Sequence, residues 1–254
     1  MQIAVNGLNI HYERMGKGRP VLLLHGWGAN TDVMRSIAQY LAAIGREAVS
    51  LDFPGFGKSD APAEPWGIPE YARFTRAFVE ALDIRGADVV AHSFGGRVTI
   101  YLAAEEAKLF GRLVLVDAAG IRPKRSLKYY LKVYSYKIGK RLAKIGFLDR
   151  IFKLSERQKN AGSADYRALS GTMRATFVKV VNHDLSPLLR RIANEVLLVW
   201  GREDKETPMY MAERMEREIP NCGLAVIENA GHFSFLDQYA RFCSIIKVLL
   251  EDRS

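Results

Sequence analysis

Residues 89–96 read Val-Val-Ala-His-Ser-Phe-Gly-Gly, and the rest of the chain can be interpreted around this stretch. An apolar run over residues 88–91 precedes Ser93, and a helix pattern over residues 97–107 follows it. Small residues stand two positions before and two after the serine, which is the pattern of a nucleophile elbow with Ala91 in place of its first glycine. Small neighbours are needed because the turn holds its central residue in a strained backbone conformation. The pattern predicts a strand, a sharp turn and a helix that present the Ser93 hydroxyl at a helix N-terminus.

The rest of the chain mostly alternates buried strands with helices. Hydrophobic alternation predicts an antiparallel hairpin over residues 2–12, with its turn at Asn6-Gly7. Short apolar runs predict further strands, at residues 21–24, 48–51, 88–91, 112–116, 195–200 and 224–227. Helical periodicity predicts the helices, at residues 33–44 (capped by Thr31 or Asp32), 68–82, 97–107, 208–219 and 236–250. This order is typical of the α/β class with a mostly parallel sheet that is covered on both faces.

The alternation stops between residues 121 and 186. Residues 126–145 instead predict an amphipathic helix, because their apolar side chains recur on one face and their lysines on the opposite one. We therefore expect two units. Residues 1–120 and 187–254 form the core, and residues 121–186 form a helical cap inserted after the sixth strand.

Positive charge is concentrated in the predicted cap. Residues 121–160 contain thirteen Lys and Arg and two acidic residues, a net charge of +11, whereas the rest of the chain has 24 basic and 26 acidic residues. Interspersed glutamates would keep a helix soluble without the repulsion between lysines. The imbalance therefore predicts an acidic partner, which is an anionic membrane surface, an acyl carrier protein or an anionic substrate. Nucleic acid is disfavoured because the sequence has no recognised nucleic-acid-binding motif.

Composition favours a globular cytoplasmic protein. The chain is 48% hydrophobic and has no low-complexity tract. Its first residues lack the basic stub and apolar run of a signal peptide, and no apolar stretch approaches the roughly 18 residues that span a bilayer. Cys222 and Cys243 have neither metal-ligand nor redox spacing. We expect both to be reduced core thiols, with a disulfide between them as the alternative.

Polar residues that follow the later strands supply partners for Ser93. A serine hydroxyl needs a base to accept its proton, and that base needs an acid to fix its tautomer. Of the five histidines, His232 is favoured because it follows the last buried strand, at the edge of the sheet where the elbow lies. Asp204 follows the strand that ends at Trp200. The order Ser, Asp, His along the chain is the one found in α/β hydrolases.

The chain resembles an α/β-hydrolase with a cap inserted after the sixth strand. The resemblance covers nearly all of the length outside the cap. It is carried by the elbow and by four other segments, which are residues 25–28 (His-Gly-Trp-Gly), 52–59 (Asp-Phe-Pro-Gly-Phe-Gly-Lys-Ser), 201–204 (Gly-Arg-Glu-Asp, with Pro208 beyond) and 231–232 (Gly-His). The resemblance implies the α/β-hydrolase fold, with a mostly parallel eight-stranded sheet covered by helices.

The same resemblance implies roles for individual residues. Ser93 would be the nucleophile, His232 the general base and acid, and Asp204 the orienting carboxylate. The backbone amides of Trp27 and Phe94 would form the oxyanion hole. Neither a metal nor an organic cofactor is implied.

Two further acids compete with Asp204 for the orienting role. Glu203 is its neighbour in the same loop. Asp117 ends the sixth predicted strand, where some members of the family place the carboxylate. We favour Asp204, with Asp117 as the main alternative.

We therefore expect a serine hydrolase that cleaves a small-molecule carboxylic ester through an acyl-enzyme intermediate. Tyr130 and Tyr134, on the apolar face of the predicted cap helix, would line the acyl pocket. A serine nucleophile disfavours the haloalkane dehalogenases and epoxide hydrolases of the family, which need an ester-forming carboxylate. Thioesters, lactones, amides and vinylogous C–C bonds stay open, because the fold hosts many chemistries.

Two other functions are the alternatives. Residues 24–30 and 54–57 look similar to pimeloyl-acyl-carrier-protein methyl ester esterases, so the first alternative is an esterase or thioesterase whose basic cap docks an acidic carrier protein. The second is a non-catalytic binding protein with the same fold. The complete set of Ser, Asp and His disfavours this second alternative.

Overall fold

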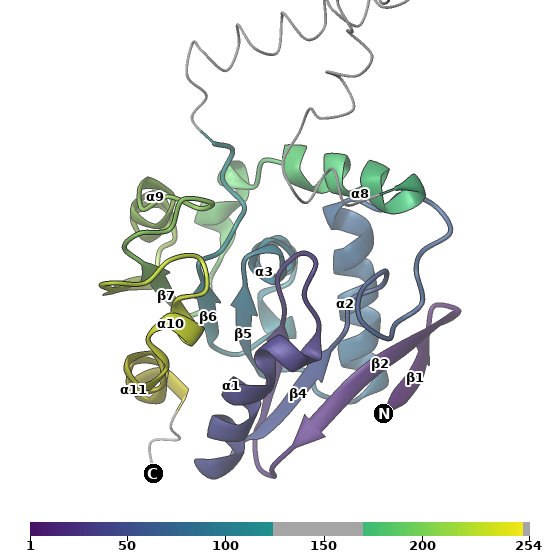
Figure 1. The fold of residues 1–254 in the computed structure, drawn as a ribbon, viewed down its shortest axis with the longest axis horizontal. Coiled ribbons are helices and arrows are strands. Elements are labelled where there is room, and N and C mark those ends of the chain that lie inside the picture. The colour runs from purple at the N-terminus through teal and green to yellow at the C-terminus, as the bar shows by residue number, and fades with distance from the viewer. Residues whose placement is uncertain (124–169, 251–254) are drawn as a thin grey trace, which may run out of the picture.

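Eight strands form one sheet in the computed structural model, which describes residues 1–123 and 170–250 (Figure 1). The strands are β1 (Gln2–Val5), β2 (Leu8–Met15), β3 (Pro20–Leu24), β4 (Glu47–Leu51), β5 (Asp88–His92), β6 (Leu113–Val116), β7 (Val196–Gly201) and β8 (Cys222–Ile227). Their order across the sheet is β1-β2-β4-β3-β5-β6-β7-β8. β2 pairs antiparallel with β1 and β4, and all pairs from β4 to β8 are parallel. The fold is thus the expected mostly parallel α/β-hydrolase sheet.

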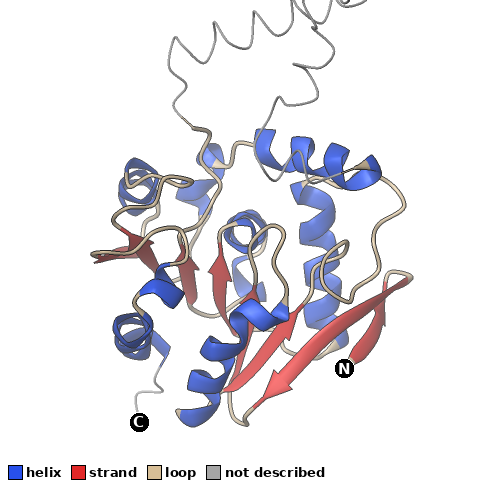
Figure 2. Cartoon of the chain, viewed as in Figure 1, coloured by secondary structure: helices blue, strands red, loops and turns tan. Residues whose placement is uncertain are grey.

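Helices cover both faces of this sheet (Figure 2). They are α1 (Thr31–Ala43), α2 (Ile68–Ala81), α3 (Phe94–Glu105), α8 (Gly171–Asn182), α9 (Tyr210–Glu218), α10 (Ser234–Asp237) and α11 (Tyr239–Leu250), with the short 3-10 helices η1 (Ala107–Leu109) and η2 (Ser186–Arg191). Apolar residues of α2, α3 and α9 pack on one face, and those of α1, α10 and α11 on the other. In β3, Leu22 and Leu24 belong to the first core and Val21 and Leu23 to the second. A strand with a core on each side needs apolar residues at every position, which is why the parallel strands read as continuous apolar runs.

The structure moves several element boundaries away from the expected ones. The N-cap of α1 is Asn30, whose side chain accepts a hydrogen bond from the amide of Asp32, so the expected cap at Thr31 or Asp32 is wrong. Helix α3 begins at Phe94, three residues before the expected start at residue 97. The expected helix over residues 236–250 is two helices, α10 and α11, because Gln238 leaves the helical conformation with φ −133° and ψ 56°.

Much of the expected cap lies outside the described residues. Residues 124–169, including Tyr130 and Tyr134 and the predicted amphipathic helix, are among those that the structure does not describe. Of the expected cap segment, residues 121–123 and 170–186 are described, and these include α8. The boundaries of a separate cap unit stay a prediction.

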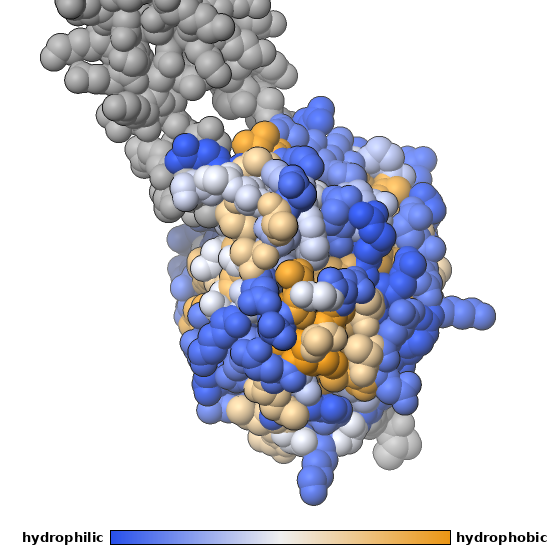
Figure 3. Space-filling model, turned by 90° about the vertical axis from the view of Figure 1, so that its right-hand side faces the viewer, coloured by the Kyte–Doolittle hydropathy of each residue, from blue (hydrophilic) through white to orange (hydrophobic). Residues whose placement is uncertain are grey.

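Three further features of the described residues are the character of one face of the surface, the hydrophobicity of the helices and the state of the two cysteines. The side of the molecule that carries β1 and β2 is mostly hydrophilic, with one hydrophobic patch near the middle of the view (Figure 3). No helix within residues 1–123 and 170–250 combines the length and hydrophobicity needed to cross a membrane. Cys243 is buried, Cys222 is half-buried, and both are free thiols.

The parallel strands bring the candidate site together. Their carboxyl ends meet at one edge of the sheet, which is where ligands bind in open α/β sheets. β3 leads there into His25, β5 into Ser93, β6 into Asp117, β7 toward Asp204 and β8 toward His232. Segments that are far apart in the sequence thus supply one site.

Candidate active site

The elbow holds Ser93 in a conformation that few side chains adopt. Strand β5 ends directly before Ser93 and α3 begins directly after it, and the residue has φ 47° and ψ −104°. A positive φ is strained for a residue other than glycine, so the surroundings must fix it. The amide of Ser93 donates to the carbonyl of Val116 at 3.0 Å, and its carbonyl accepts from the amide of Ala119 at 3.0 Å. These bonds tie the turn to the end of β6.

The two glycines after Phe94 are needed because the elbow packs against other backbone. A Cβ atom on Gly95 would lie 2.5 Å from the carbonyl oxygen of Leu24, and one on Gly96 would lie 2.6 Å from the Cβ of Ala118. Real Cβ atoms do not approach other atoms so closely. Ala91, which replaces the first elbow glycine, is fully buried in β5. The close approach is therefore on the helix side of the turn.

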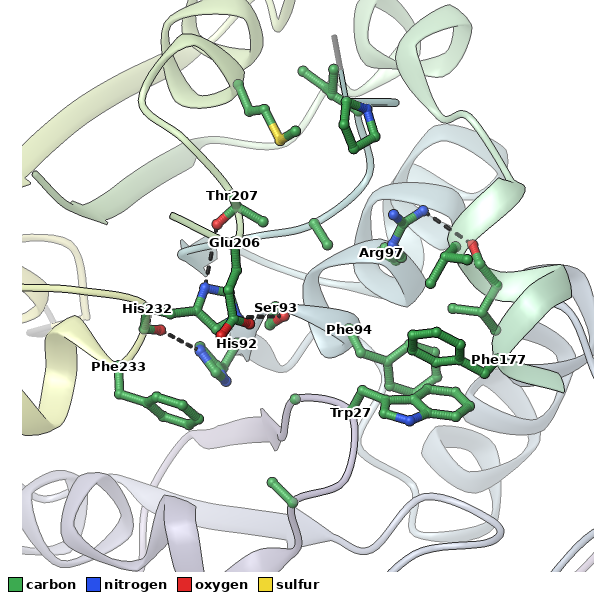
Figure 4. A pocket seen from close by; sticks show the side chains of 18 residues that line it. Trp27, His92, Ser93, Phe94, Arg97, Phe177, Glu206, Thr207, His232 and Phe233 are labelled. Carbon is green, nitrogen blue, oxygen red and sulfur yellow. Dashed lines mark hydrogen bonds and ion pairs between the residues drawn. The ribbon is translucent and has the colours of Figure 1, made fainter. Parts of the chain in front are cut away.

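Ser93, His232 and Asp204 form one chain of hydrogen bonds. Figure 4 shows its first link, between Ser93 and His232. The Nε2 atom of His232 lies 3.0 Å from the Oγ of Ser93, and its Nδ1 lies 2.8 Å from Oδ2 of Asp204. A carboxylate can only accept, so Nδ1 carries a proton and Nε2 of the neutral ring is left to accept the serine proton. The arrangement is that of a nucleophile, a general base and an orienting acid.

Asp204 is itself held by three donors from its own loop. Oδ1 accepts from the amides of Glu206 and Thr207 at 2.8 and 2.9 Å, and Oδ2 accepts from the hydroxyl of Thr207. Burial acts to raise the pKa of Asp204, but the hydrogen bonds from His232 and Thr207 outweigh it and the pKa is lowered. The carboxyl group of Asp204 is therefore ionised in the folded protein near neutral pH.

The charge of Asp204 also changes the acidity of His232. Burial acts to lower the pKa of His232, but the hydrogen bond and the charge of Asp204, helped by Glu206 and Asp117, raise it above the ordinary value of 6.5. The carboxylate of Glu206 lies 3.4 Å from Nε2 of His232. The imidazolium that forms during proton transfer thus has a carboxylate near each ring nitrogen.

The competing acids occupy other places. Asp117 accepts from the amide of Gly201 and from the amide and hydroxyl of Ser234, and burial raises its pKa to about 7. It braces the ends of β6 and β7 against α10. Glu203 is exposed, and its amide donates to the carbonyl of Ala230. Of the three acids, Asp204 is the one in hydrogen-bond contact with His232.

The loop after β3 and the elbow contribute the two backbone amides expected to form the oxyanion hole. A Cβ on Gly26 would lie 3.4 Å from the Cβ of Ser93, so this loop packs directly on the elbow. The next amide is that of Trp27, whose ring contacts the ring of Phe94 with centroids 5.3 Å apart. In the described part of the chain, no hydrogen-bond acceptor is found for the amides of Trp27 and Phe94. Such free donors beside a nucleophile suit an oxyanion hole.

Comparison with protein families agrees with this geometry. The family described as alpha/beta hydrolase fold matches residues 19–239, which include all five strand ends that form the site. The chain belongs to the α/β-hydrolase family.

Curated relatives of this α/β-hydrolase are similar over most of its length. It is 26% identical over 254 residues to an AB hydrolase superfamily protein of Bacillus subtilis, which covers 94% of each chain. It is 27% identical over 250 residues to a 2-hydroxy-6-oxo-6-phenylhexa-2,4-dienoate hydrolase of Burkholderia cepacia, over 91% of this chain and 87% of the relative. A 2-hydroxymuconate semialdehyde hydrolase of Pseudomonas putida is 25% identical, over 99% and 94%. The chain is accordingly a hydrolytic enzyme.

Solved structures share the fold. An esterase from Exiguobacterium antarcticum aligns with a TM-score of 0.77 and 22% identity, over 99% of each chain. A meta-cleavage product hydrolase aligns with a TM-score of 0.75 and 21% identity, over 100% of this chain and 98% of the other. At such identities the likeness extends to the fold alone.

The site of this α/β-hydrolase opens into a pocket of 630 Å³, a volume that suits a small-molecule substrate. Ser93 lies on its wall, between two groups of side chains (Figure 4). Glu206, Thr207 and His232 lie on one side of the serine. Trp27, Phe94, Phe177 and Arg97 lie on the other.

Helix α8 covers the part of the pocket that is lined by Trp27, Phe94, Phe177 and Arg97. It brings Phe177 to the ring of Trp27, with centroids 5.1 Å apart, and Val180 to the pocket wall. The helix is fastened to the loop after β4, because the hydroxyl of Thr176 accepts from the amide of Trp66 and Lys179 donates to the carbonyl of Pro65. Helix α8 thus contributes to the described pocket wall, whereas the expected lining residues Tyr130 and Tyr134 lie outside the described residues.

Two polar residues of the pocket wall were not anticipated from the sequence, and a third polar residue, His92, has a structural role. Arg97 and Glu206 line the pocket, and Nε2 of His92 donates to the carbonyl of His232 at 2.8 Å, which fixes the backbone of the catalytic loop. Burial lowers the pKa of His92 to about 3, so this ring stays neutral. The signal for Arg97 was a charged residue one turn into a helix that the pattern otherwise buries. Glu206 gave no signal beyond its place two residues after Asp204.

Proposed function

We propose that this α/β-hydrolase cleaves carboxylic esters through an acyl-enzyme formed on Ser93. The observation that supports it is the hydrogen-bonded chain from Ser93 through His232 to Asp204, beside the amides of Trp27 and Phe94. A neutral histidine in hydrogen-bond contact with a serine activates the hydroxyl, and amides without acceptors stabilise the oxyanion that follows.

The proposed reaction has two halves. His232 takes the Ser93 proton at Nε2 while Oγ attacks the ester carbonyl, and the negative oxygen accepts hydrogen bonds from the two amides. The imidazolium, stabilised by Asp204, then gives its proton to the leaving alcohol as the C–O bond breaks. A water molecule repeats the sequence on the acyl-enzyme, with His232 again as base. The acid is released and Ser93 recovers its proton.

Cleavage of a vinylogous C–C bond is the second candidate. The relatives from Burkholderia cepacia and Pseudomonas putida, named as dienoate and semialdehyde hydrolases, favour it. We place it second because an alkoxide leaves with a proton from His232 alone, whereas a carbanion is a much poorer leaving group and needs stabilisation beyond the groups already found in the site.

A series of p-nitrophenyl esters, from acetate to palmitate, tests the proposal. We expect steady release of p-nitrophenol that Ser93→Ala abolishes, and labelling of the wild type by a fluorophosphonate that the variant lacks. The Burkholderia relative's dienoate should be turned over more slowly than the best ester. Turnover of the dienoate alone would overturn the proposal in favour of C–C cleavage, and absence of both turnover and labelling would favour a binding protein.

An acidic partner for the basic segment is part of the proposal. The net charge of +11 over residues 121–160 supports an anionic membrane surface or an acyl carrier protein, the latter making the substrate a carrier-bound ester or thioester.

A further inference from the structure

Arg97 is a buried cation on the wall of the catalytic pocket. Only 7% of the residue is exposed, and it lies one helical turn after Ser93, to whose carbonyl its amide donates at 3.3 Å. Burial lowers its pKa to about 10, which still leaves the guanidinium protonated at neutral pH. A desolvated charge is costly unless something compensates it.

The compensation found in the structure is incomplete. Nη1 of Arg97 donates to the carbonyl of Val180 at 3.2 Å (Figure 4) and to that of His183 at 2.9 Å. Over residues 1–123 and 170–250, Arg97 forms no ion pair with a carboxylate and no hydrogen bond through its other side-chain nitrogens. Asp184, whose charge acts on the guanidinium, uses its Oδ1 for Ser186 and for the amide of Arg122. A guanidinium has five donors, so Arg97 retains capacity for an anion.

The reaction assigns chemistry to the two sides of the pocket. The leaving group takes its proton from Nε2 of His232, so it must lie on the side of His232 and Glu206. The acyl group then extends to the opposite side, where Arg97 lies among Trp27 and Phe177 (Figure 4). One helical turn is about 5.4 Å, so an anionic group a few methylenes from the scissile carbonyl reaches Arg97.

Glu206 places a negative charge on the leaving-group side of the pocket, opposite in sign to the charge of Arg97. Its carboxylate lies 3.4 Å from Nε2 of His232, on the pocket wall, and 68% of its side chain is exposed. An anionic leaving group would therefore be repelled at the place where it must be protonated. Discrimination by one attractive and one repulsive charge is a common source of specificity.

We propose that the pocket selects acyl groups that carry a carboxylate, which Arg97 binds, and that Glu206 excludes a negative charge from the leaving group. The substrate class is the monoester of a dicarboxylic acid with an uncharged alcohol. This inference rests on the proposed ester hydrolysis.

Matched esters test the acyl half of the proposal. The p-nitrophenyl monoester of adipic acid and its uncharged carboxamide share a leaving group and nearly share a shape. We expect kcat/KM to favour the carboxylate by about tenfold, the effect of a charge-assisted hydrogen bond. Arg97→Met should abolish this preference, mainly through KM, and Arg97→Lys should keep part of it.

Arg122→Met is the matched control, because Nη2 of Arg122 also donates to a backbone carbonyl, that of Asn182, but the residue is not on the wall of this pocket. It should keep the full preference. The preference is a ratio within each variant, so general damage to the fold affects both esters alike. A wild-type ratio near one, an equal loss in Arg122→Met, or an equal loss of both esters in Arg97→Met would overturn the role of Arg97.

A second pair of esters tests the leaving-group half. The 4-carboxyphenyl and 4-carbamoylphenyl esters of hexanoic acid differ in the charge of the phenol. Glu206→Gln should raise kcat/KM for the charged ester relative to the neutral one by about threefold or more, the scale of a partly screened charge pair. Glu203→Gln removes a charge from the same loop and should leave the ratio unchanged. Equal effects of the two variants would show that Glu206 acts only through the net charge.

The inference and the proposed function fail separately. Turnover of the neutral esters that Ser93→Ala abolishes supports ester hydrolysis whatever the charge preference is. If no ester is cleaved, the proposed function fails. Shifts in melting temperature on adding small compounds then test whether Arg97 binds a carboxylate. The site then stands if the monoamide of adipic acid, but not its diamide, stabilises the wild type and not Arg97→Met. It falls if the two compounds act alike.

Discussion

Contacts of single atoms favour Asp204 over Asp117 as the orienting acid. Asp204 bonds to His232, whereas Asp117 bonds to backbone and to Ser234. We expect Asp204→Asn to reduce kcat by about four orders of magnitude, because an amide favours the wrong tautomer of the histidine. Asp117→Asn should instead lower the melting temperature, because the amide nitrogen that replaces one carboxylate oxygen cannot accept a hydrogen bond from Gly201 or Ser234. It should change kcat of the folded enzyme by less than about tenfold. Ser93→Ala provides the background rate.

The opposite pattern would identify Asp117 as the orienting acid. It would consist of Asp204→Asn retaining more than about a tenth of the activity while folded Asp117→Asn lost it. Circular dichroism of both variants separates loss of chemistry from loss of structure.

The pH profile depends on the carboxylates around His232. Burial lowers the pKa of this residue, and Asp204, Glu206 and Asp117 together raise it above 6.5, while His92, with a pKa of about 3, stays uncharged. The base must be neutral, so activity is lost as pH falls through a raised pKa. We expect the acid limb of kcat/KM for a neutral ester to have its midpoint above 6.5.

Glu206→Gln should move this midpoint to lower pH, because one of the charges that favour the imidazolium is gone. Glu203→Gln is the control and should leave the midpoint in place. A profile that both variants shift equally, or that neither shifts, would contradict a direct action of Glu206 on His232.

The sequence predicted the residues whose chemistry has few substitutes. Ser93, Asp204 and His232 could be placed from their order and from the strands that precede them, and the structure brings them within hydrogen-bond reach. Arg97 and Glu206 could not be predicted. Their role depends on which wall of a pocket they face, and that depends on how α3 and the loop after β7 pack, which no periodic pattern encodes.

At the scale of elements, the elbow depends on close contact between α3 and β3. Gly95→Ala would place a Cβ 2.5 Å from the backbone oxygen of Leu24, which has no room to move within the sheet. We expect a loss of about 3 kcal/mol in the free energy of unfolding and a loss of activity, as for overpacked cores. Gly223→Ala in β8 is the control, since its Cβ would meet no atom within 4 Å.

Urea unfolding monitored by tryptophan fluorescence measures both variants. The tight packing of the elbow would be contradicted if Gly95→Ala were as stable as Gly223→Ala.

Element boundaries were predicted less well than element types, for local reasons. Helix α3 starts three residues before the predicted start, because the positive φ of Ser93 ends the strand and begins the helix within one residue. The sequence did not reveal this, because Phe-Gly-Gly shows no helical periodicity. The break between α10 and α11 falls at Gln238, where neither glycine nor proline marks it in the sequence.

At the scale of the whole molecule, charge is divided between the core and the basic segment. Changing Lys128, Lys132, Lys140 and Lys144 together to Glu lowers the net charge of that segment by eight units. We expect binding to anionic vesicles or to an acyl carrier protein to weaken, most strongly at low salt, with little change in turnover of a small neutral ester. Sedimentation with vesicles and pull-down of the carrier protein at two salt concentrations measure the effect.

The two readouts distinguish the partners. Loss of vesicle binding alone indicates a membrane surface, and loss of carrier binding alone indicates an acyl carrier protein. Wild-type binding of both by the quadruple variant would remove the docking role from these lysines.

Helix α8 and the catalytic residues are held by different parts of the chain. The triad stands on the ends of β5, β7 and β8, whereas α8 is fastened through Thr176 and Lys179 to the loop after β4. Substitutions on the pocket-facing side of α8 can therefore change the wall of the pocket while the ends of these strands still hold Ser93, Asp204 and His232. Over evolutionary time, such a layout lets descendants of one ancestor exchange substrates while inheriting the same reaction, and it makes Phe177 and Val181 the natural place to begin a laboratory selection for new ones.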